Sequence, residues 1–266
     1  MANGTTSPVE RQRPMTRVNI LGVLVTAITV PELHERLRYH IERGRKALVL
    51  HANVHCLNIA WEQDWYRVFL NSADIVFCDG AGVQLAARLL GHRMPQRITY
   101  ADWIWKLGRF AERHGYSFFF LGGQPGVAKL AAKQLTQRFP DLKVSGVEHG
   151  FFDKSRDSEE NEAMVARINS AGADILIVGF GMPLQEEWLS ENWESIQANV
   201  ALTGGAVFDY LSGSLRRAPG WMRRIGLEWL GRLLIEPSRL WRRYLVGNPR
   251  FLWRVVKQRL RSQLAE

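Results

Sequence analysis

Small and polar residues follow several short apolar runs along this chain, and they include side chains suited to catalysis. Asp79 follows the run 75–78, and His51 and Asn53 follow the run 47–50. Three later runs are followed by the segments GGQPG (122–126), GFGMPLQE (179–186) and GGAVFD (204–209). Glycine lets backbone N–H groups approach a ligand closely. A carboxylate such as Asp79 can accept a proton as a general base.

The apolar runs predict the elements that would position these segments. We expect strands at residues 47–50, 75–78, 118–121, 143–147, 175–178 and 200–203, with helices between them at 83–90, 127–139 and 185–193. Short continuous apolar strands separated by helices are typical of a parallel sheet covered on both faces. The sequence therefore predicts an α/β, Rossmann-like fold. Ligands bind beyond the carboxyl ends of such strands, so the five segments are expected to converge on one site.

Each segment also has a purely structural interpretation. Asp79 or Asn53 could cap the helix that follows it. Gln185 could belong to an ordinary helix start, Asp209 could be an acid in a turn, and the glycines could be plain turn residues. A histidine such as His51 is more often packed or solvated than catalytic. Only the convergence of five segments favours a functional site.

The positive charge of the chain is concentrated at one end. The net charge is +9, but residues 215–266 hold 13 basic and 3 acidic residues, a net charge of +10. The remainder is near neutral, which argues against a general nucleic-acid-binding protein. We predict a disordered N-terminus (1–15), an α/β body (16–213) and a basic, helical, membrane-docking appendage (214–266).

The C-terminal region has the pattern of a basic amphipathic helix. Leu252, Val256 and Leu260 recur at helical spacing, and basic residues occupy another face at Arg250, Arg254, Lys257 and Arg261. With tryptophans at 221, 229, 241 and 253, this pattern suits a membrane surface. The alternative is a helical hairpin packed on the body. No apolar run reaches the roughly 18 residues of a spanning helix, so we expect a peripheral protein.

An ordered series of motifs between residues 18 and 244 resembles the WecG/TagA/CpsF glycosyltransferases, glycosyltransferase family 26. The motifs read ADIVFCDG (73–80), RITYAD (97–102), LGGQPG (121–126), GMPLQE (181–186), GGAVFD (204–209), RAP (217–219) and GLEWL (226–230). The resemblance implies inverting transfer of a sugar from a UDP-sugar to a lipid-diphosphate-linked acceptor. That acceptor is typically an undecaprenyl-diphosphate sugar at the cytoplasmic face of the bacterial inner membrane.

The resemblance also implies roles for individual residues. Asp79 matches the proposed general base, and the C-terminal appendage is expected to dock at the membrane and help close the site. Two departures, His51 where many members have threonine and Tyr100 where many have glycine, leave the sugars open. We predict that substrate is bound by His51, Asn53, Arg97, Thr99, Asp102, Gly122, Gly123, Gln185, Gly204, Gly205 and Asp209.

Departure of UDP develops negative charge that must be neutralised. Many nucleotide-sugar enzymes use a metal held by an Asp-X-Asp triplet, which this sequence lacks. We therefore expect no metal or cofactor. Arginines or helix N-termini would neutralise the charge of the departing UDP in its place. The candidates for binding the diphosphate or the membrane are Arg216, Arg217, Arg224 and Arg232.

These observations predict a glycosyltransferase of exopolysaccharide or cell-surface polysaccharide biosynthesis. We favour UDP-glucose as the donor, with N-acetylmannosaminyl or N-acetylmannosaminuronyl transfer as the alternative. A more distant alternative is a non-enzymatic basic adaptor for membranes or nucleic acid. A dinucleotide-dependent oxidoreductase is disfavoured because the loop at Gly122 lacks the G-x-G-x-x-G spacing. Expected partners are the donor, the lipid-linked acceptor and an anionic membrane, without nucleic acid; the oligomeric state, a homo-oligomer included, stays open.

Overall fold

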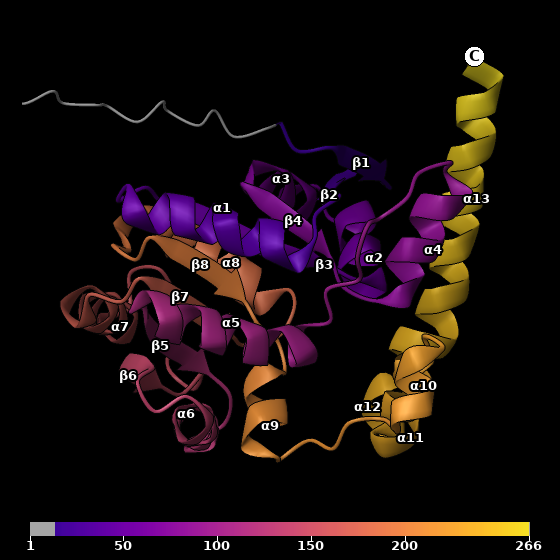
Figure 1. Cartoon of the computed structure of the whole chain (residues 1–266). Coiled ribbons are helices and arrows are strands. Elements are labelled where there is room, and N and C mark those ends of the chain that lie inside the picture. The colour runs from indigo at the N-terminus through magenta and orange to yellow at the C-terminus, as the bar shows by residue number, and fades with distance from the viewer. Residues whose placement is uncertain (1–13, 266) are drawn as a thin grey trace, which may run out of the picture.

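The computed structural model describes residues 14–265 and contains one eight-stranded sheet (Figure 1). The predicted disorder of residues 1–15 therefore falls almost entirely outside the described residues. The strands are β1 (Arg17–Ile20), β2 (Val23–Thr26), β3 (Ala47–Ala52), β4 (Ile75–Cys78), β5 (Ser117–Gly122), β6 (Lys143–Glu148), β7 (Ile175–Gly179) and β8 (Val200–Thr203).

The sheet has the order β1-β2-β4-β3-β8-β7-β5-β6. Every neighbouring pair is parallel except β1 and β2, which form an antiparallel hairpin at one edge. The strand order reverses at the centre, where β3 lies beside β8, and such a reversal opens a crevice at the carboxyl edge. The predicted α/β class with a mostly parallel sheet is confirmed.

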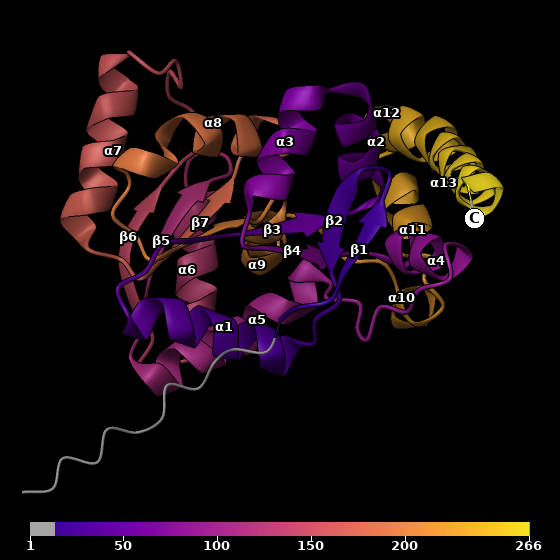
Figure 2. The ribbon, with the colours of Figure 1, turned by 90° about the horizontal axis from the view of Figure 1, so that it is seen from above.

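Helices cover both faces of the sheet (Figure 2). One face packs against α1 (Val30–Glu42), α5 (Tyr100–His114), α6 (Val127–Arg138) and α9 (Val207–Ser212). The other face packs against α2 (Val54–Glu62), α3 (Asp64–Ser72), α4 (Ala81–Leu89), α7 (Glu159–Ala171) and α8 (Leu184–Asn192). Strand β3 shows the reason: Val49 belongs to the first core, whereas Leu48 and Leu50 belong to the second. Successive strand side chains point to opposite faces, so both faces are apolar.

The C-terminal segment (residues 214–265) forms a chain of helices at one end of the sheet (Figure 1). It comprises α10 (Gly220–Arg224), α11 (Glu228–Ile235), α12 (Pro237–Trp241), a π-helical turn (Arg242–Val246) and α13 (Gly247–Ala265). Leu233, Leu240 and Tyr244 form a small core of its own. No helix within residues 14–265 is long and apolar enough to cross a membrane.

Helix α13 packs along α2 and α4 and joins the main core through Phe251 and Val255. Arg254, which the sequence pattern assigns to a basic face, is instead buried against the body. Its guanidinium donates to Asn58 Oδ1 at 2.8 Å and pairs with Glu62 Oε1 at 2.6 Å. The same helix therefore presents basic residues to solvent and uses one of them as a structural anchor.

Candidate active site

A cavity of about 1820 Å³ lies between the carboxyl edge of the sheet and the C-terminal segment. All five strand-end segments contribute to its wall. Their lining residues include His51, Asn53, Asp79, Gly80, Gly123, Gln124, Gly181, Met182, Gly204, Gly205 and Asp209. The C-terminal segment forms the opposite wall with residues from α11, α12, the π-helical turn and α13. The structure thus brings together the segments on which the sequence-based hypothesis depends.

Asp79 lies directly after β4, where its amide donates to the Ala52 carbonyl at 2.8 Å. The side chain is half-buried and lines the cavity. Burial raises the pKa of Asp79 to about 7, and the nearby charge of Glu228 acts in the same direction. Three guanidinium groups oppose this shift, those of Arg243, Arg97 and Arg232. A carboxylate with a pKa near 7 is well matched to general-base catalysis at neutral pH.

A second carboxylate, Asp209, lies in the first turn of α9 and also lines the cavity. Burial raises its pKa, while the positive charge of Arg239 opposes the shift. Both acids therefore face one cavity from neighbouring parts of the sheet edge. Of the two, only Asp79 is both adjacent to a strand end and influenced by the arginines at 97, 232 and 243 together.

Asn53 and Thr99 line the cavity from the beginnings of two helices. Asn53 Oδ1 accepts from the Cys56 amide at 3.0 Å, so the capping role considered from sequence is real. Its Nδ2 group lies 3.9 Å from Met182 Sδ. Thr99 occupies the N-cap position of α5, yet its side chain makes no capping hydrogen bond. Its hydroxyl is therefore not committed to the helix.

Of the four glycines predicted to bind substrate, three line the cavity and one does not. Gly123, Gly204 and Gly205 belong to the wall. Gly122 is buried, with φ +147°, and a Cβ there would lie 2.4 Å from the Gly179 carbonyl oxygen. Its small size thus permits the close approach of β5 and β7 rather than contact with a ligand.

Gln185 is fully buried and does not line the cavity. Its Oε1 accepts from the amides of Gly181 at 3.2 Å and Gly205 at 3.0 Å, and its Nε2 donates to Glu186 Oε1 at 2.7 Å. One side chain therefore ties together the loops after β7 and β8. The predicted substrate ligand is located where it shapes the wall, behind the surface that a substrate would contact.

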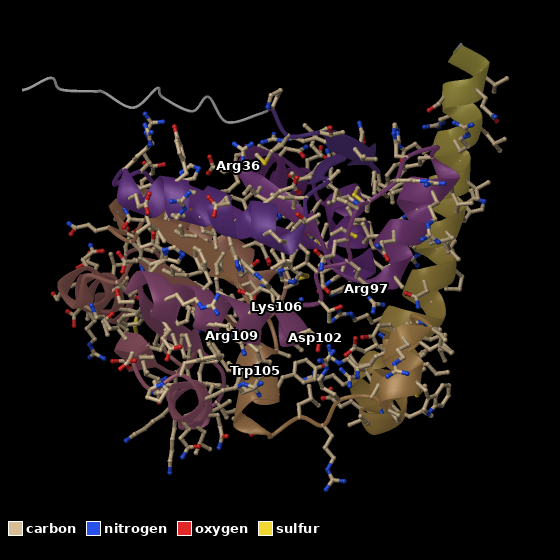
Figure 3. All side chains as sticks on the ribbon, viewed as in Figure 1. Arg36, Arg97, Asp102, Trp105, Lys106 and Arg109 are labelled. Atoms are coloured by element: carbon tan, nitrogen blue, oxygen red, sulfur yellow. The ribbon has the colours of Figure 1, made fainter. Side chains whose placement is uncertain are left out.

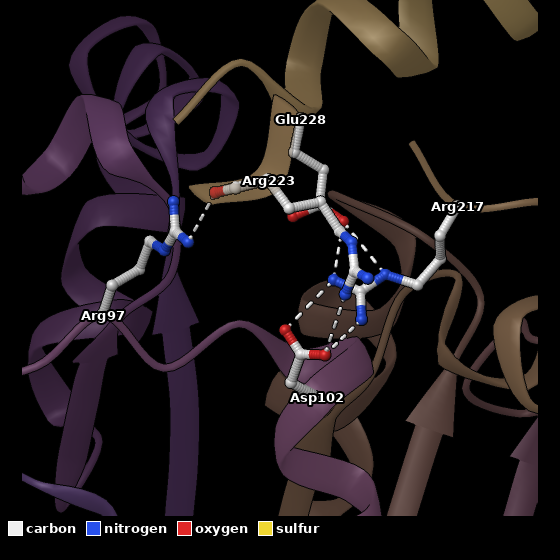
Figure 4. A network of polar contacts seen from close by, with 5 residues as sticks. All are labelled: Arg97, Asp102, Arg217, Arg223 and Glu228. Carbon is white, nitrogen blue, oxygen red and sulfur yellow. Dashed lines mark hydrogen bonds and ion pairs between the residues drawn. The ribbon is translucent and has the colours of Figure 1, made fainter. Parts of the chain in front are cut away.

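Arg97, Asp102 and the C-terminal segment are joined by one polar network (Figure 4). Arg97 lines the cavity and donates to the Arg223 carbonyl at 3.0 Å. Asp102 lies outside this cavity, where both of its oxygens accept from Arg217. Arg217 also pairs with Glu228 at 2.7 Å. This network connects α5 and the loop before it to α10 and α11.

Figure 3 shows Arg97 and Asp102 at the end of α5 nearer to the C-terminal segment, with Lys106 and Arg109 farther along the helix. Asp102, Lys106 and Arg109 line a separate groove of about 930 Å³ between α1 and α5. Arg97 and Thr99 border both spaces. Of the predicted substrate ligands, Asp102 is therefore the one that lines the groove and not the cavity.

The arginines predicted in the C-terminal region have different environments. Arg232 lines the cavity, whereas Arg216 and Arg224 are exposed and lie outside it. Arg217 is held in the network described above. Sequence reasoning missed Arg243, which lines the cavity and makes no hydrogen bond or ion pair within residues 14–265. Its position in a π-helical turn, an element common at functional sites, could not be read from the helical spacing.

Among residues 14–265, no group of three or more His, Cys, Asp or Glu side chains is arranged to hold a metal ion. The two cysteines are free and buried. Burial raises the pKa of Cys56 to about 12, as it does that of Cys78. Both thiols therefore stay protonated at neutral pH.

The fold and the cavity define an α/β protein in which strand-end carboxylates face arginines of a C-terminal segment across one cavity. The model of the glycosyl transferase WecG/TagA/CpsF family matches residues 18–265, and the chain belongs to this family of glycosyltransferases. Proteins of Staphylococcus aureus strains NCTC 8325 / PS 47 and COL are 27% identical over 260 residues, which cover 97% of this chain and 99% of each relative. The protein of strain MW2 is 26% identical over the same span. All three are named N-acetylglucosaminyldiphosphoundecaprenol N-acetyl-beta-D-mannosaminyltransferase.

Proposed function

We propose that this chain transfers a sugar from a UDP-sugar to an undecaprenyl-diphosphate-linked sugar, with inversion and without a metal. The observation that carries the proposal is the meeting of Asp79 with Arg232 and Arg243 in one cavity. The carboxylate supplies a base for the attacking group. The guanidinium groups supply positive charge for the departing diphosphate.

In the proposed reaction, an acceptor hydroxyl oxygen attacks the anomeric carbon on the face opposite the diphosphate. Its proton passes to Asp79 as the new glycosidic bond forms. The bond between the anomeric carbon and the diphosphate oxygen breaks, and UDP departs with the electron pair. Arg232 and Arg243 stabilise the charge that develops on this oxygen, a role that is strongest in a water-poor cavity.

The names of the relatives bear on the choice of sugars. They describe transfer of N-acetylmannosamine to N-acetylglucosaminyl-diphosphoundecaprenol. This supports N-acetylmannosaminyl transfer, our alternative from sequence, better than the glucosyl transfer that we favoured. We therefore propose UDP-N-acetylmannosamine as the first donor to test and a lipid-diphosphate-linked N-acetylglucosamine as the acceptor. The pathway would be the synthesis of a lipid-linked cell-surface polysaccharide.

Because the proposed acceptor is a lipid, the reaction would take place at the cytoplasmic face of the membrane. The C-terminal segment has the exposed apolar and basic side chains that binding to this surface requires. Among the described residues, 12 of the 20 exposed large hydrophobic side chains lie at position 221 or beyond. Trp221, Leu234 and Trp253 are each more than 60% exposed. Exposed tryptophan and leucine beside an excess of arginine favour peripheral binding to an anionic surface.

The test is a transfer assay with purified full-length protein, a synthetic lipid-diphosphate N-acetylglucosamine acceptor and a panel of labelled UDP-sugars. We expect product from UDP-N-acetylmannosamine, inversion at its anomeric carbon, and unchanged rates in EDTA. Product from UDP-glucose alone would restore the original donor assignment. Complete loss of activity in EDTA would contradict metal independence, and no product from any UDP-sugar would contradict the proposed function.

A further inference from the structure

The cavity wall near Asp79 contains a tyrosine hydroxyl that the proposed chemistry does not use. Tyr100 is the first residue of α5, lines the cavity and is only 5% exposed. Its hydroxyl oxygen is buried and has no hydrogen-bond partner within residues 14–265. Leaving a buried hydroxyl unpaired is unfavourable. At the wall of a ligand cavity, the missing partner can be supplied by the ligand.

The ring that carries this hydroxyl packs against three other aromatic rings. Its centroid lies 5.6 Å from that of His51, 6.2 Å from that of Phe77 and 5.2 Å from that of Trp103. Close packing of this kind restricts side-chain rotation. The hydroxyl is therefore presented in a fixed position rather than being free to turn to solvent.

The backbone fixes Tyr100 beside the proposed base. The Ile98 amide donates to the Cys78 carbonyl at 2.9 Å, which attaches the start of α5 to the end of β4, immediately before Asp79. Burial raises the pKa of Tyr100, and the negative charge of Asp79 raises it further. The hydroxyl thus stays protonated and able to donate a hydrogen bond.

His51 completes this part of the wall as a neutral group. Burial lowers the pKa of His51 to about 4, and its Nδ1 lies 3.2 Å from Thr203 Oγ1. Since Nδ1 is engaged by Thr203, the imidazole is oriented by the strand next to its own. Tyr100 therefore rests against a fixed, uncharged neighbour.

We propose that Tyr100 is a specificity-determining residue whose hydroxyl donates a hydrogen bond to an oxygen substituent of the sugar reacting beside Asp79. This inference rests on the proposed function, because it assumes that a sugar occupies the cavity. A sugar without that oxygen would leave the hydroxyl buried and unpaired. Sites built in this way discriminate strongly against such analogues. The sugar could belong to the donor or to the acceptor.

The variant Tyr100→Phe removes only the hydroxyl. We expect kcat/KM for the preferred sugar pair to fall about 10- to 100-fold, the usual range for losing a buried hydrogen bond to substrate. The thermal midpoint should not fall, because the unliganded protein loses an unpaired group. Binding of UDP, which lacks the sugar to be transferred, should be unchanged. The matched control is Tyr116→Phe, whose hydroxyl lies 3.4 Å from Glu42 and away from the cavity.

Deoxy analogues of the donor and of the acceptor sugar, assayed against wild type and Tyr100→Phe, distinguish the two sources. We expect one analogue, from one of the two sugars, to react equally well with both proteins. Activity of Tyr100→Phe within two-fold of wild type for the preferred pair would overturn the inference. So would the same loss for every analogue, or a displaced acid limb of the pH profile, which would assign Tyr100 to Asp79 instead. A wild type that binds no UDP and transfers no sugar would overturn the proposed function as well.

Discussion

The α/β body and the C-terminal segment supply opposite halves of the same cavity. The body is nearly neutral and contributes the carboxylates Asp79 and Asp209 from the rigid edge of a buried sheet. The C-terminal segment carries the net positive charge and contributes Arg232 and Arg243. Its small core contains three buried residues, and much of its apolar surface faces solvent. In the proposed mechanism, base chemistry and charge neutralisation therefore fall to different parts of the chain.

Because each region supplies one wall of the cavity, the contacts between the two regions determine how these walls are positioned. Phe251 and Val255 of α13 are buried in the core of the body, and Arg254 is anchored by Asn58 and Glu62. Those contacts fix α13 beside the cavity, which Phe251, Asn58 and Glu62 also line. At α10 and α11 the connection is polar and depends on Arg217 and on the Arg97 hydrogen bond (Figure 4).

The largest effect is expected from Asp79→Asn, which breaks the body's half of the chemistry alone. Loss of a general base lowers kcat by about 10²- to 10⁴-fold. Binding of UDP should stay close to wild type, because the arginines of the C-terminal segment remain. Single-turnover transfer and UDP titration measure the two quantities separately.

The matched control for that variant is Asp209→Asn, which changes the other carboxylate of the cavity in the same way. We expect it to retain far more activity than Asp79→Asn. If the order is reversed, Asp209 is the base and Asp79 has another role.

The next effect concerns only the C-terminal segment. Replacing Trp221, Leu234, Leu245 and Trp253, which are exposed and lie outside the cavity wall, by serine should lower affinity for anionic liposomes by about 100-fold or more, because each apolar side chain inserted in a membrane contributes roughly 1.5–3 kcal/mol. These side chains are exposed, so folding should be little affected. Transfer to a short-chain, water-soluble acceptor should persist, as measured beside liposome flotation.

The control for this variant replaces Val68 and Leu130, which are exposed on the body, by serine. It should float with liposomes as well as wild type does. Equal flotation of the fourfold variant would instead make the C-terminal segment a packing element without a membrane role.

The pH dependence of transfer tests both regions, because charges of the C-terminal segment influence the pKa of Asp79 in the body. Because burial raises the pKa of Asp79 to about 7, the base is deprotonated above that value and protonated below it. We expect kcat/KM to rise with pH through about 7 and to fall roughly ten-fold for each unit below it. A plateau extending down to pH 5 would contradict Asp79 as the base. Tm measured across the same range identifies any loss caused by unfolding.

The body was easier to predict from the sequence than the C-terminal segment, for physical reasons. Strands buried on both faces leave continuous apolar runs, so β4 and β8 begin and end where expected. Helix α5 was not predicted, although its apolar residues repeat at helical spacing. Between residues 220 and 246 the C-terminal segment breaks into short helices before the 19-residue α13 begins, and these breaks leave no clear periodicity in the sequence.

The site shows the same contrast. Strand-end residues such as Asp79 and Gly205 could be predicted to meet, because parallel topology brings carboxyl ends together. Whether each of these side chains points into the cavity or away from it could not be predicted. Gln185 faces inward because two amides need an acceptor, and Asp102 is drawn outward by Arg217. Arg243 lines the cavity from a π-helical turn, whose residue spacing differs from that of an α-helix.

The smallest effect is expected from Arg217→Ala, which weakens the connection between the regions and leaves both halves of the chemistry intact. Removing this guanidinium leaves Glu228 without its 2.7 Å partner. Since the charge of Glu228 raises the pKa of Asp79, freeing it should raise that pKa further. A partly exposed pair contributes about 1 kcal/mol, so we expect the acid limb to move up by roughly half to one pH unit.

Activity of Arg217→Ala at pH 7 should therefore fall about two- to five-fold and recover partly at pH 8, because a higher pH deprotonates Asp79 again. The exposed neighbour is the control: Arg216→Ala should leave the pH profile in place. Hydrogen exchange in α10 and α11 should rise only in the Arg217 variant. A uniform loss at all pH values would mean that Arg217 contacts substrate directly, and the cationic contribution of the C-terminal segment would then extend to Arg217.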